Sequence, residues 1–481
     1  MWTIEEILQG SGGRIRGGGT DELSIRTLRG FSIDTRTIRR DDVFIAIQGP
    51  HFDGHDFVAD AFRKEGAVAL VSQAAFRQRE AEWSLLRRKH FFVVVEDTLQ
   101  ALQATARWHR RRFNIPLIGI TGSNGKTTTK EMIADILSRR GTVLKNEGNL
   151  NNHIGLPLSL LRLQEGDCAA VLEIGISRKD EMKELCDIAA PTVGLITNIG
   201  PAHLAGLGNL EGVAREKGRL FQSIGRSGGT AIINSDDPFL NPWTEKLSSF
   251  WSFGLAPSAD VSVTDLEEKG GGMTFNLHLN RDGHRKQGVT LSATGRHQVM
   301  NALAAAAASA VLGVGLNDIC EGLGAFRPPE NRGEVIKLKG LHVLFDAYNA
   351  NPASVRAGLE MLTSYRPGVE VGAKQGRKLA ILGDMYELGD ITESAHFDVG
   401  RWAAEMGLDG LITVGEWAEK MAEGARQEGL PEACISIHRD LASVQIFMRK
   451  AFRKGDCILI KGSRGMKMEI LLDALESEGS H

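Results

Sequence analysis

The sequence predicts an α/β protein of three domains, and three observations support this prediction. The chain has 481 residues, more than one hydrophobic core usually serves. Continuous apolar segments alternate with helical patterns from about residue 114 onward, which is typical of parallel strands covered by helices on both faces. A Pro-rich turn at 327–333 separates two such stretches. We therefore expect domains at 1–112, 113–328 and 329–481.

The first domain is expected to be a small α/β unit. The segments VFIAI (43–47) and AVALVS (67–72) have the apolar character of strands, and the helical pattern DFVADAFRKEG between them ends at Gly66. The segment FSIDTRTIRRDDVF (31–44) combines short polar residues with arginines. Its spacing alone favours a solvated loop.

The central domain opens with an apolar strand, PLIGI (116–120), which runs into TGSNGK and then into a helix. This arrangement is typical of phosphate-binding loops, because backbone N–H groups and Lys126 face the anion and a Thr hydroxyl can hold Mg²⁺. The match to GxxxxGK[ST] is incomplete, since Ile120 stands where the first glycine is usual. An ordinary glycine-rich turn is the alternative, and the run GSNGKT (122–127) disfavours it.

Further strands are expected on both sides of the Pro-rich turn. A Gly-rich segment at 260–288 predicts a hairpin excursion from the main sheet, and an Ala-rich segment at 295–313 predicts a closely packed helix. The other expected strands are AAVLEIGI (169–176), TVGLITNIG (192–200), GTAIINSDD (229–237), LHVLFDAY (341–348), RKLAILGDM (377–385), DGLITVG (409–415) and DCILIKGSRG (456–465).

Composition narrows the class of protein. The apolar content of 42% and charged content of 24% are ordinary for a globular protein, and the net charge of −3 argues against nucleic acid as the main partner. Five scattered cysteines without a CxxC pair argue against a disulfide framework or a zinc site. No apolar run approaches a membrane span, and the N-terminus lacks a signal-peptide pattern. We expect a cytoplasmic protein.

Four polar residues stand where chemistry is often found. Glu173 ends an apolar strand, His203 and Asp346 follow strand ends, and Lys217 lies on a predicted helix. Ligands of α/β sheets bind at the carboxyl ends of strands, where Glu173, His203 and Asp346 would lie, whereas the position of Lys217 alone indicates surface charge. Each also has an ordinary alternative: a solvated carboxylate, a structural loop histidine or a surface lysine.

The motifs together resemble those of the Mur ligase family. In the family's order they are TGSNGKTTTKEM, NEGNLNNHIGLPLSLL, EIGISRKDEM, TNIGPAHL, GRHQVMNALAA, FDAYNANPASV and LGDMYELG. The resemblance covers nearly the whole chain and implies a UDP-sugar-binding module, a central ATPase of the P-loop type with a parallel sheet, and a Rossmann-like domain. The motifs GDMYELG and YNANP, with the N-terminal segment, favour the member that adds D-alanyl-D-alanine to UDP-muramyl-tripeptide.

The resemblance also implies roles for individual residues. The ATP phosphates would lie on Gly122, Ser123, Asn124, Gly125, Lys126, Thr127 and Thr128, the adenine on Asn301, and the far side of the nucleotide on Arg332 and Asp346. The uridine diphosphate would contact Ser32, Thr35 and Arg36, and further substrate contacts would come from Asn149, Asn151, Asn152 and Asn349.

Two Mg²⁺ ions are also implied by the resemblance. Thr127 and Glu173 would hold the first, and His203 with Lys217 the second. An ammonium cannot ligate a cation, but in the family this lysine is carbamylated, which makes it an anionic oxygen donor. The chain departs from the family at Ala347, beside Asp346 where an acidic pair is frequent, and at Arg219, where an acidic residue is common.

The implied reaction activates a carboxylate as an acyl phosphate, which an amine then attacks. Lys126, Glu173, His203 and Lys217 are its expected catalytic residues. Other amide ligases of the superfamily are the nearest alternatives: the diaminopimelate- or lysine-adding muramyl ligases and folylpolyglutamate synthase. A nucleotide-dependent switch without chemistry is the alternative from another class. We expect a monomer. No motif reports the third residue of the peptide substrate, diaminopimelate or lysine, or bears on oligomeric state.

Overall fold

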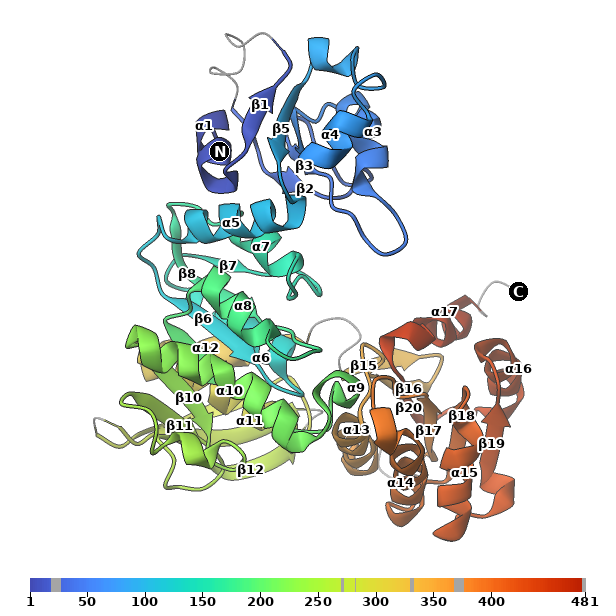
Figure 1. The fold of residues 1–481 in the computed structure, drawn as a ribbon. Coiled ribbons are helices and arrows are strands. Elements are labelled where there is room, and N and C mark those ends of the chain that lie inside the picture. Colours follow the sequence, from blue (N-terminus) through green and yellow to red (C-terminus); the bar gives the residue numbers. More distant parts are fainter. Residues whose placement is uncertain (19–26, 270–271, 282, 329–332, 367–375, 478–481) are drawn as a thin grey trace. The chain divides into compact units, whose positions relative to one another are not determined.

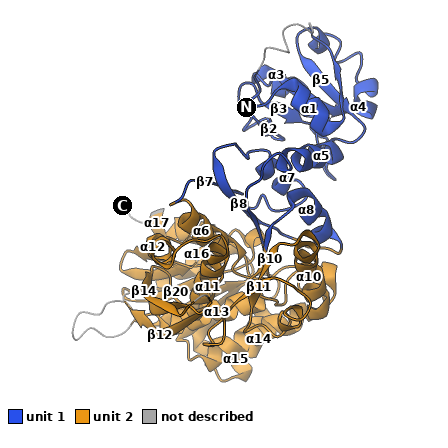
Figure 2. Cartoon of the chain, turned by 90° about the vertical axis from the view of Figure 1, so that its left-hand side faces the viewer, with its two compact units in different colours: residues 1–119, 140–175, 180–193 blue, residues 120–139, 176–179, 194–481 orange. Residues whose placement is uncertain are grey.

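The computed structural model describes residues 1–18, 27–269, 272–281, 283–328, 333–366 and 376–477 (Figure 1). Contacts divide the chain into two compact units (Figure 2). The first contains residues 1–119, 140–175 and 180–193, and the second contains 120–139, 176–179 and 194–481. Strands β6 (Leu117–Thr121) and β9 (Val193–Ile196) each begin in the first unit and end in the second.

The first unit opens with a five-stranded sheet in the order β1-β5-β4-β3-β2. Strand β1 is antiparallel to β5, and the other neighbours are parallel. Its core packs Phe44, Phe92 and the fully buried Trp83 together. The elements are α1 (Ile4–Ser11), β1 (Arg14–Arg16), β2 (Phe31–Ser32), β3 (Val43–Ile45), η1 (Gly54–Phe57), α3 (Val58–Arg63), β4 (Val68–Ser72), α4 (Gln73–Gln78), η2 (Leu86–Arg88), β5 (Phe91–Val95) and α5 (Thr98–Arg110). The expected small α/β unit is therefore present.

The rest of the first unit is a parallel strand pair with two helices. Strand β7 (Thr142–Lys145) pairs with β8 (Asp167–Glu173). Helix α7 (Gly155–Leu160) connects the two strands, and α8 (Glu181–Ala189) follows β8. Helix α5 is tied to α8, because Arg110 donates from Nε to the carbonyl of Ala189 at 3.1 Å. The predicted strand that ends at Glu173 is confirmed.

The second unit contains a sheet that mixes parallel and antiparallel strands. Strands β10, β11 and β12 are parallel, whereas β12, β13 and β14 are antiparallel. The predicted hairpin exists, but through β11 it extends the main sheet instead of leaving it. The elements are α6 (Lys126–Leu137), α9 (Leu204–Leu207), α10 (Leu210–Ser227), β10 (Thr230–Asn234), η3 (Asn241–Trp243), β11 (Phe250–Phe253), β12 (Val261–Lys269), β13 (Gly272–Leu279), β14 (Arg285–Leu291), α11 (Arg296–Val311) and α12 (Leu316–Ala325).

The Ala-rich helix α11 is buried almost all round, as the sequence predicted. Residues 302–308 are at most 1% exposed, and α11 packs against α6. Small side chains let the two helix backbones approach closely, which places α11 beside the loop that precedes α6.

The C-terminal portion is a six-stranded sheet in the order β15-β16-β20-β17-β18-β19. Strand β15 is antiparallel to β16, and the others are parallel. The elements are β15 (Glu334–Leu338), β16 (Leu341–Phe345), α13 (Pro352–Ser364), β17 (Lys378–Gly383), η4 (Gly389–Ile391), α14 (Thr392–Glu405), β18 (Gly410–Val414), α15 (Ala418–Gln427), η5 (Glu432–Cys434), β19 (Ile435–His438), α16 (Leu441–Ala451), β20 (Cys457–Lys461), η6 (Arg464–Met466) and α17 (Glu469–Ser477).

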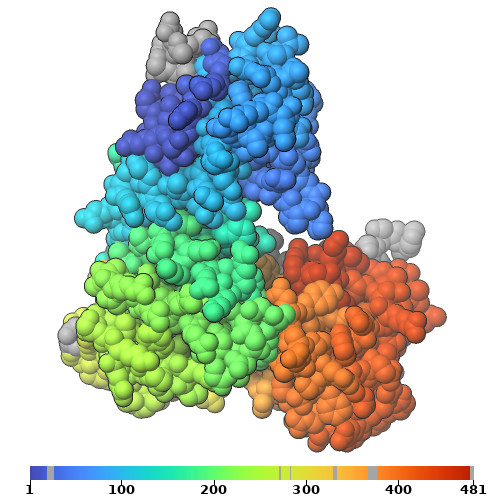
Figure 3. Space-filling view, in the orientation of Figure 1, coloured from blue at the N-terminus to red at the C-terminus, as the bar shows by residue number. Residues whose placement is uncertain are grey.

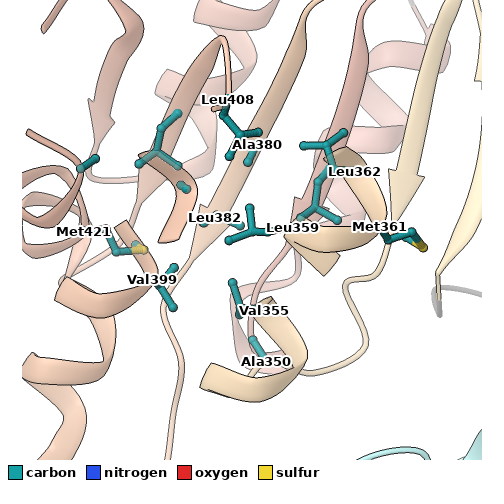
Figure 4. Packing of buried hydrophobic residues seen from close by; sticks show 14 of the residues in the cluster. Ala350, Val355, Leu359, Met361, Leu362, Ala380, Leu382, Val399, Leu408 and Met421 are labelled. Carbon is teal, nitrogen blue, oxygen red and sulfur yellow. The ribbon is translucent and has the colours of Figure 1, made fainter. Parts of the chain in front are cut away.

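Both faces of this C-terminal sheet are covered by helices. Leu359 of α13 lies beside Leu382 of β17 on one face (Figure 4), and a second apolar cluster around Ile381 and Ile460 fills the other. The C-terminal portion, coloured orange to red, forms one closely packed body in the space-filling view (Figure 3). All five cysteines are free, and among the described residues no helix has the length and apolar character that crossing a membrane requires.

Candidate functional site

The loop between β6 and α6 is built on two glycines. Gly122 has φ +148° and Gly125 has φ +81°, which side chains rarely tolerate. A Cβ on Gly122 would lie 1.9 Å from Thr197 Oγ1, and a Cβ on Gly125 would lie 2.2 Å from Asn301 Oδ1. The loop therefore needs glycine at both positions for its backbone path and for space.

The same loop is anchored by Asn198, which follows strand β9. The N–H of Ser123 donates to the carbonyl of Asn198 at 2.9 Å. The Asn198 side chain accepts from the N–H of Asn124 and donates to its carbonyl, both at 3.0 Å. Sequence reasoning missed Asn198, although a polar residue directly after a buried strand was the available signal.

Two lysines reach the carbonyl of Gly122. Lys126 begins α6 and donates from Nζ to this oxygen at 2.9 Å. Lys217 comes from α10, is 1% exposed, and donates to the same oxygen at 3.0 Å. Because the side chain of Lys217 is buried, the surface-lysine alternative is wrong. The loop therefore gathers two lysine side chains at one carbonyl.

Helices α6 and α11 meet beside this loop. Thr127 and Thr128 are buried in the first turn of α6. The amide of Asn301 on α11 accepts from Thr129 Oγ1 at 3.4 Å and donates to Gln298 Oε1 at 3.2 Å. The predicted nucleotide residue Asn301 thus lies at the base of the loop.

Glu173 belongs to the first unit and is buried at the carboxyl end of β8. Its Oε1 accepts from Asn151 Nδ2 at 2.9 Å. Asn146, which sequence reasoning missed, accepts from the N–H of Glu173 at 3.0 Å and donates to its carbonyl at 2.9 Å. Asn152 Oδ1 accepts from the N–H of Gly155 at the start of α7, and Asn149 is exposed. The Asn-rich motif therefore holds Glu173 and its loop in place.

The predicted uridine diphosphate residues lie at the end of β2 and in the turn that follows it. Ser32 Oγ accepts from the N–H of Asp34 at 3.2 Å, and Arg36 forms a bidentate pair with Asp34, whose shortest distance is 2.6 Å. The hydrogen bonds from Arg36 lower the pKa of Asp34 below its usual value. Lys64 Nζ donates to the carbonyl of Thr35 at 2.9 Å. This turn therefore carries an exposed guanidinium with an ammonium beside it.

Asp346 follows β16 and pairs with a lysine that sequence reasoning missed. Lys461, which ends β20 and is 2% exposed, places Nζ 2.5 Å from Asp346 Oδ2 and 3.0 Å from the carbonyl of Asn349. A lysine at the end of an apolar strand was the available signal. The predicted residue Arg332 lies outside the described residues.

His203 and Asn124 both contact the C-terminal portion of the second unit. His203 Nδ1 lies 2.5 Å from Glu387 Oε2, and Asn351 Nδ2 donates to Asn124 Oδ1 at 2.8 Å. In the part of the chain that the structure describes, no three His, Cys, Asp or Glu side chains gather as a metal site. The predicted metal set also uses Thr127 and Lys217, which are not of these residue types.

A strand, a glycine loop and a helix that opens with Lys-Thr define a nucleotide-phosphate-binding protein of the P-loop class. Comparison with known proteins then identifies the family. The catalytic domain of the Mur ligase family matches residues 27–110, the Mur ligase middle domain matches 120–309, and the Mur ligase glutamate ligase domain matches 331–464.

Relatives match over almost the whole length. The chain is 35% identical over 457 residues to the UDP-N-acetylmuramoyl-tripeptide–D-alanyl-D-alanine ligase of Bacillus subtilis, covering 94% of each chain. It is 33% identical to the Escherichia coli enzyme of the same name, covering 94% of this chain and 95% of the relative. The chain therefore belongs to the Mur ligase family, a family of ATP-dependent ligases.

Solved structures agree with this assignment. A MurF structure from Acinetobacter baumannii matches with a TM-score of 0.85 and 31% identity, covering 99% of each chain. A MurF ligase from Thermotoga maritima in complex with ADP matches with a TM-score of 0.77 and 27% identity, covering 94% of this chain and 97% of that one. The predicted three-domain α/β fold is confirmed. The boundaries after residues 112 and 328 stay predictions.

Proposed function

We propose that this chain uses ATP to join D-alanyl-D-alanine to UDP-N-acetylmuramoyl-tripeptide, releasing ADP and phosphate. The observation that carries the ATP part is the pair of lysines, Lys126 and Lys217, that meet at the Gly122 carbonyl of the phosphate loop. The choice of substrates rests on the Bacillus subtilis and Escherichia coli relatives, which are named as ligases of these two substrates and match over 94% of this chain.

The chemistry requires activation because a carboxylate is a poor electrophile. The terminal carboxylate of the tripeptide attacks the γ-phosphorus of ATP, which forms an acyl phosphate and releases ADP. The dipeptide amine then attacks the acyl carbon, loses a proton, and expels phosphate from a tetrahedral intermediate. The first step brings two anions together, so the ammonium of Lys126 would offset charge on the transferred group.

The residues proposed for the first Mg²⁺ fit a hard cation. Thr127 brings a hydroxyl oxygen and Glu173 a buried carboxylate, and Mg²⁺ prefers oxygen ligands. A bound Mg²⁺ would spread the negative charge of the phosphates. For a second Mg²⁺, His203 brings a ring nitrogen. Lys217 would serve only as a carbamate, because its ammonium has no lone pair to give.

Substrate contacts are proposed for the remaining predicted residues. Arg36, on the turn after β2, and Lys64, at the end of α3, bring positive charge suited to a diphosphate, together with Ser32 and Thr35. Asn301 would meet the adenine, and Asp346 the far side of the nucleotide. Because ATP is a substrate, we place the reaction in the cytoplasm. We also propose that the protein acts as a monomer, since a single chain contains all of these proposed site residues.

An ADP-release assay tests this proposal against its alternatives. UDP-muramyl-tripeptide is offered with a panel of single amino acids and dipeptides, with diaminopimelate or lysine as the third residue. ADP is expected only when D-alanyl-D-alanine and the tripeptide are both present. ADP formed with the dipeptide alone would point to dipeptide activation, and ADP formed without either substrate would favour a nucleotide-dependent switch.

A further inference from the structure

His203 makes a short contact with a residue 184 positions away. Its Nδ1 lies 2.5 Å from Oε2 of Glu387, in the loop after β17. The backbones also meet, because the N–H of Ala205 donates to the carbonyl of Glu387 at 3.4 Å. The contact therefore joins two loops by side chain and by main chain.

Both partners have an uncommon backbone conformation. His203 has φ +56° and Glu387 has φ +62°, the left-handed region that few non-glycine residues adopt. Such strain persists where the surroundings require it, and it gathers at functional sites. Because both His203 and Glu387 have this conformation and their side chains meet, we infer that the two loops are held so that this contact forms.

The chemistry of the pair fixes the histidine tautomer. A carboxylate accepts hydrogen bonds and has no N–H to donate, and Oε2 of Glu387 lies 2.5 Å from Nδ1 of His203. Nδ1 of His203 must therefore carry the proton. In the neutral ring, Nε2 then keeps its lone pair and faces away from the carboxylate, as a metal-ligating histidine requires.

We propose that Glu387 is a positioning residue that holds His203 in the tautomer and orientation needed to ligate a divalent cation. The inference rests on the proposed function, which gives His203 its place at the second Mg²⁺. Histidine ligands of metals commonly donate their other N–H to a carboxylate, and loss of that partner typically costs 10- to 100-fold in metal affinity. Glu387, in the C-terminal portion, would thereby raise the affinity of His203 for a divalent cation.

Titration with Mn²⁺, followed by electron paramagnetic resonance, tests the proposal on the full chain with a non-hydrolysable ATP analogue. His203→Ala identifies the binding step that depends on the histidine. Glu387→Ala is expected to weaken the same step by 10-fold or more, and Glu387→Gln by less, because an amide oxygen still accepts from Nδ1. Asp390→Ala, an exposed carboxylate three positions further on, is the matched control and should leave Mn²⁺ affinity unchanged.

A second readout reports the tautomer directly. In protein labelled with ¹⁵N-histidine, His203→Gln assigns the His203 signals, which should show Nδ1–H in the parent and a mixture of tautomers in Glu387→Ala. Unchanged Mn²⁺ affinity and tautomer in a folded Glu387→Ala variant would overturn the inference, as would a His203→Ala variant that binds Mn²⁺ like the parent. Failure of the proposed reaction is distinguishable, because it would abolish ADP release while the Mn²⁺ differences persisted.

Discussion

Asn351 donates a hydrogen bond from Nδ2 to Oδ1 of Asn124, at 2.8 Å and across 227 positions of the chain. The same side chain caps helix α13, since its Oδ1 accepts from the N–H of Ser354 at 2.9 Å. One buried amide therefore starts a C-terminal helix and touches the phosphate loop. Its two functions can be separated by substitution, because only the cap needs an acceptor.

Asn351→Asp should keep the cap and lose the contact with Asn124, because a carboxylate caps a helix as well as an amide does but cannot donate. We expect a melting temperature close to that of the parent and a KM for ATP raised several-fold. Asn351→Ala should show the raised KM and also lose about 1 kcal/mol of stability. A parent-like KM in both variants would show that nucleotide binding does not depend on this contact.

Lys126→Ala should lower kcat by on the order of 10²–10³-fold, because a charge that offsets the phosphates in the transition state is lost. The fold should survive, since Lys126 lies at the end of the loop, where α6 begins, and its Nζ donates to the carbonyls of Gly122 and Ser123 in that same loop. Steady-state ADP release and circular dichroism measure the two effects. Lys183→Ala, an exposed lysine on α8, is the control. Turnover within a few-fold of the parent would remove Lys126 from the ATP site.

Lys217→Ala should be nearly inactive, and the sign of the missing charge can be tested by chemical rescue. If Lys217 acts as a carbamate, small carboxylic acids that enter the vacated space should restore part of the ADP release, whereas small alkylamines should not. Depletion of bicarbonate should also slow the parent enzyme. Rescue by amines alone would mean that Lys217 acts as an ammonium, at 3.0 Å from the Gly122 carbonyl.

Acid should weaken the first unit through His109. Burial lowers the pKa of His109 to about 4, although its Nε2 also bonds the carbonyl of Leu163 at 2.9 Å. In the unfolded chain His109 has a pKa near 6.5, so between about pH 6.5 and pH 4 the unfolded chain binds a proton at His109 and the folded chain does not. This contribution to stability is complete above about pH 6.5 and is lost as the pH falls toward 4.

Urea unfolding at pH 7 and pH 4.5 measures this loss. His109→Gln cannot take up the proton yet can still donate to Leu163, so it should lose less stability on acidification than the parent does. His51→Gln, an exposed histidine, should behave like the parent. Equal pH dependence in all three proteins would rule out His109 as the source.

Motif chemistry allowed the phosphate loop, the strand before it and the strand that ends at Glu173 to be predicted. The burial of Lys217 could not be, because helical spacing does not say which polar side chain turns inward. Asn198, Asn146 and Lys461 escaped for a shared reason: they bind main-chain carbonyls, and those contacts exist only after distant segments meet.

Two edge strands of the C-terminal sheet also escaped prediction. The strands β15 and β19 are short and partly exposed, so neither shows the continuous apolar run that marks a central strand. Each lies at one end of the C-terminal sheet, where only one neighbour is needed. In this sheet, patterns of single segments predicted the middle strands and missed the outermost ones.

The division of the chain into interleaved segments has a consequence for how it is made. The first compact unit needs residues up to 193, so it cannot be complete until well over a third of the chain has left the ribosome. Residues 120–139 emerge earlier yet belong to the second unit, and they must wait for partners that are translated later. The C-terminal sheet draws all six strands from 334–461, so it can form as one continuous segment emerges. Nascent chains released at successive lengths should therefore gain protease resistance in separate steps, the last of which belongs to the C-terminal sheet.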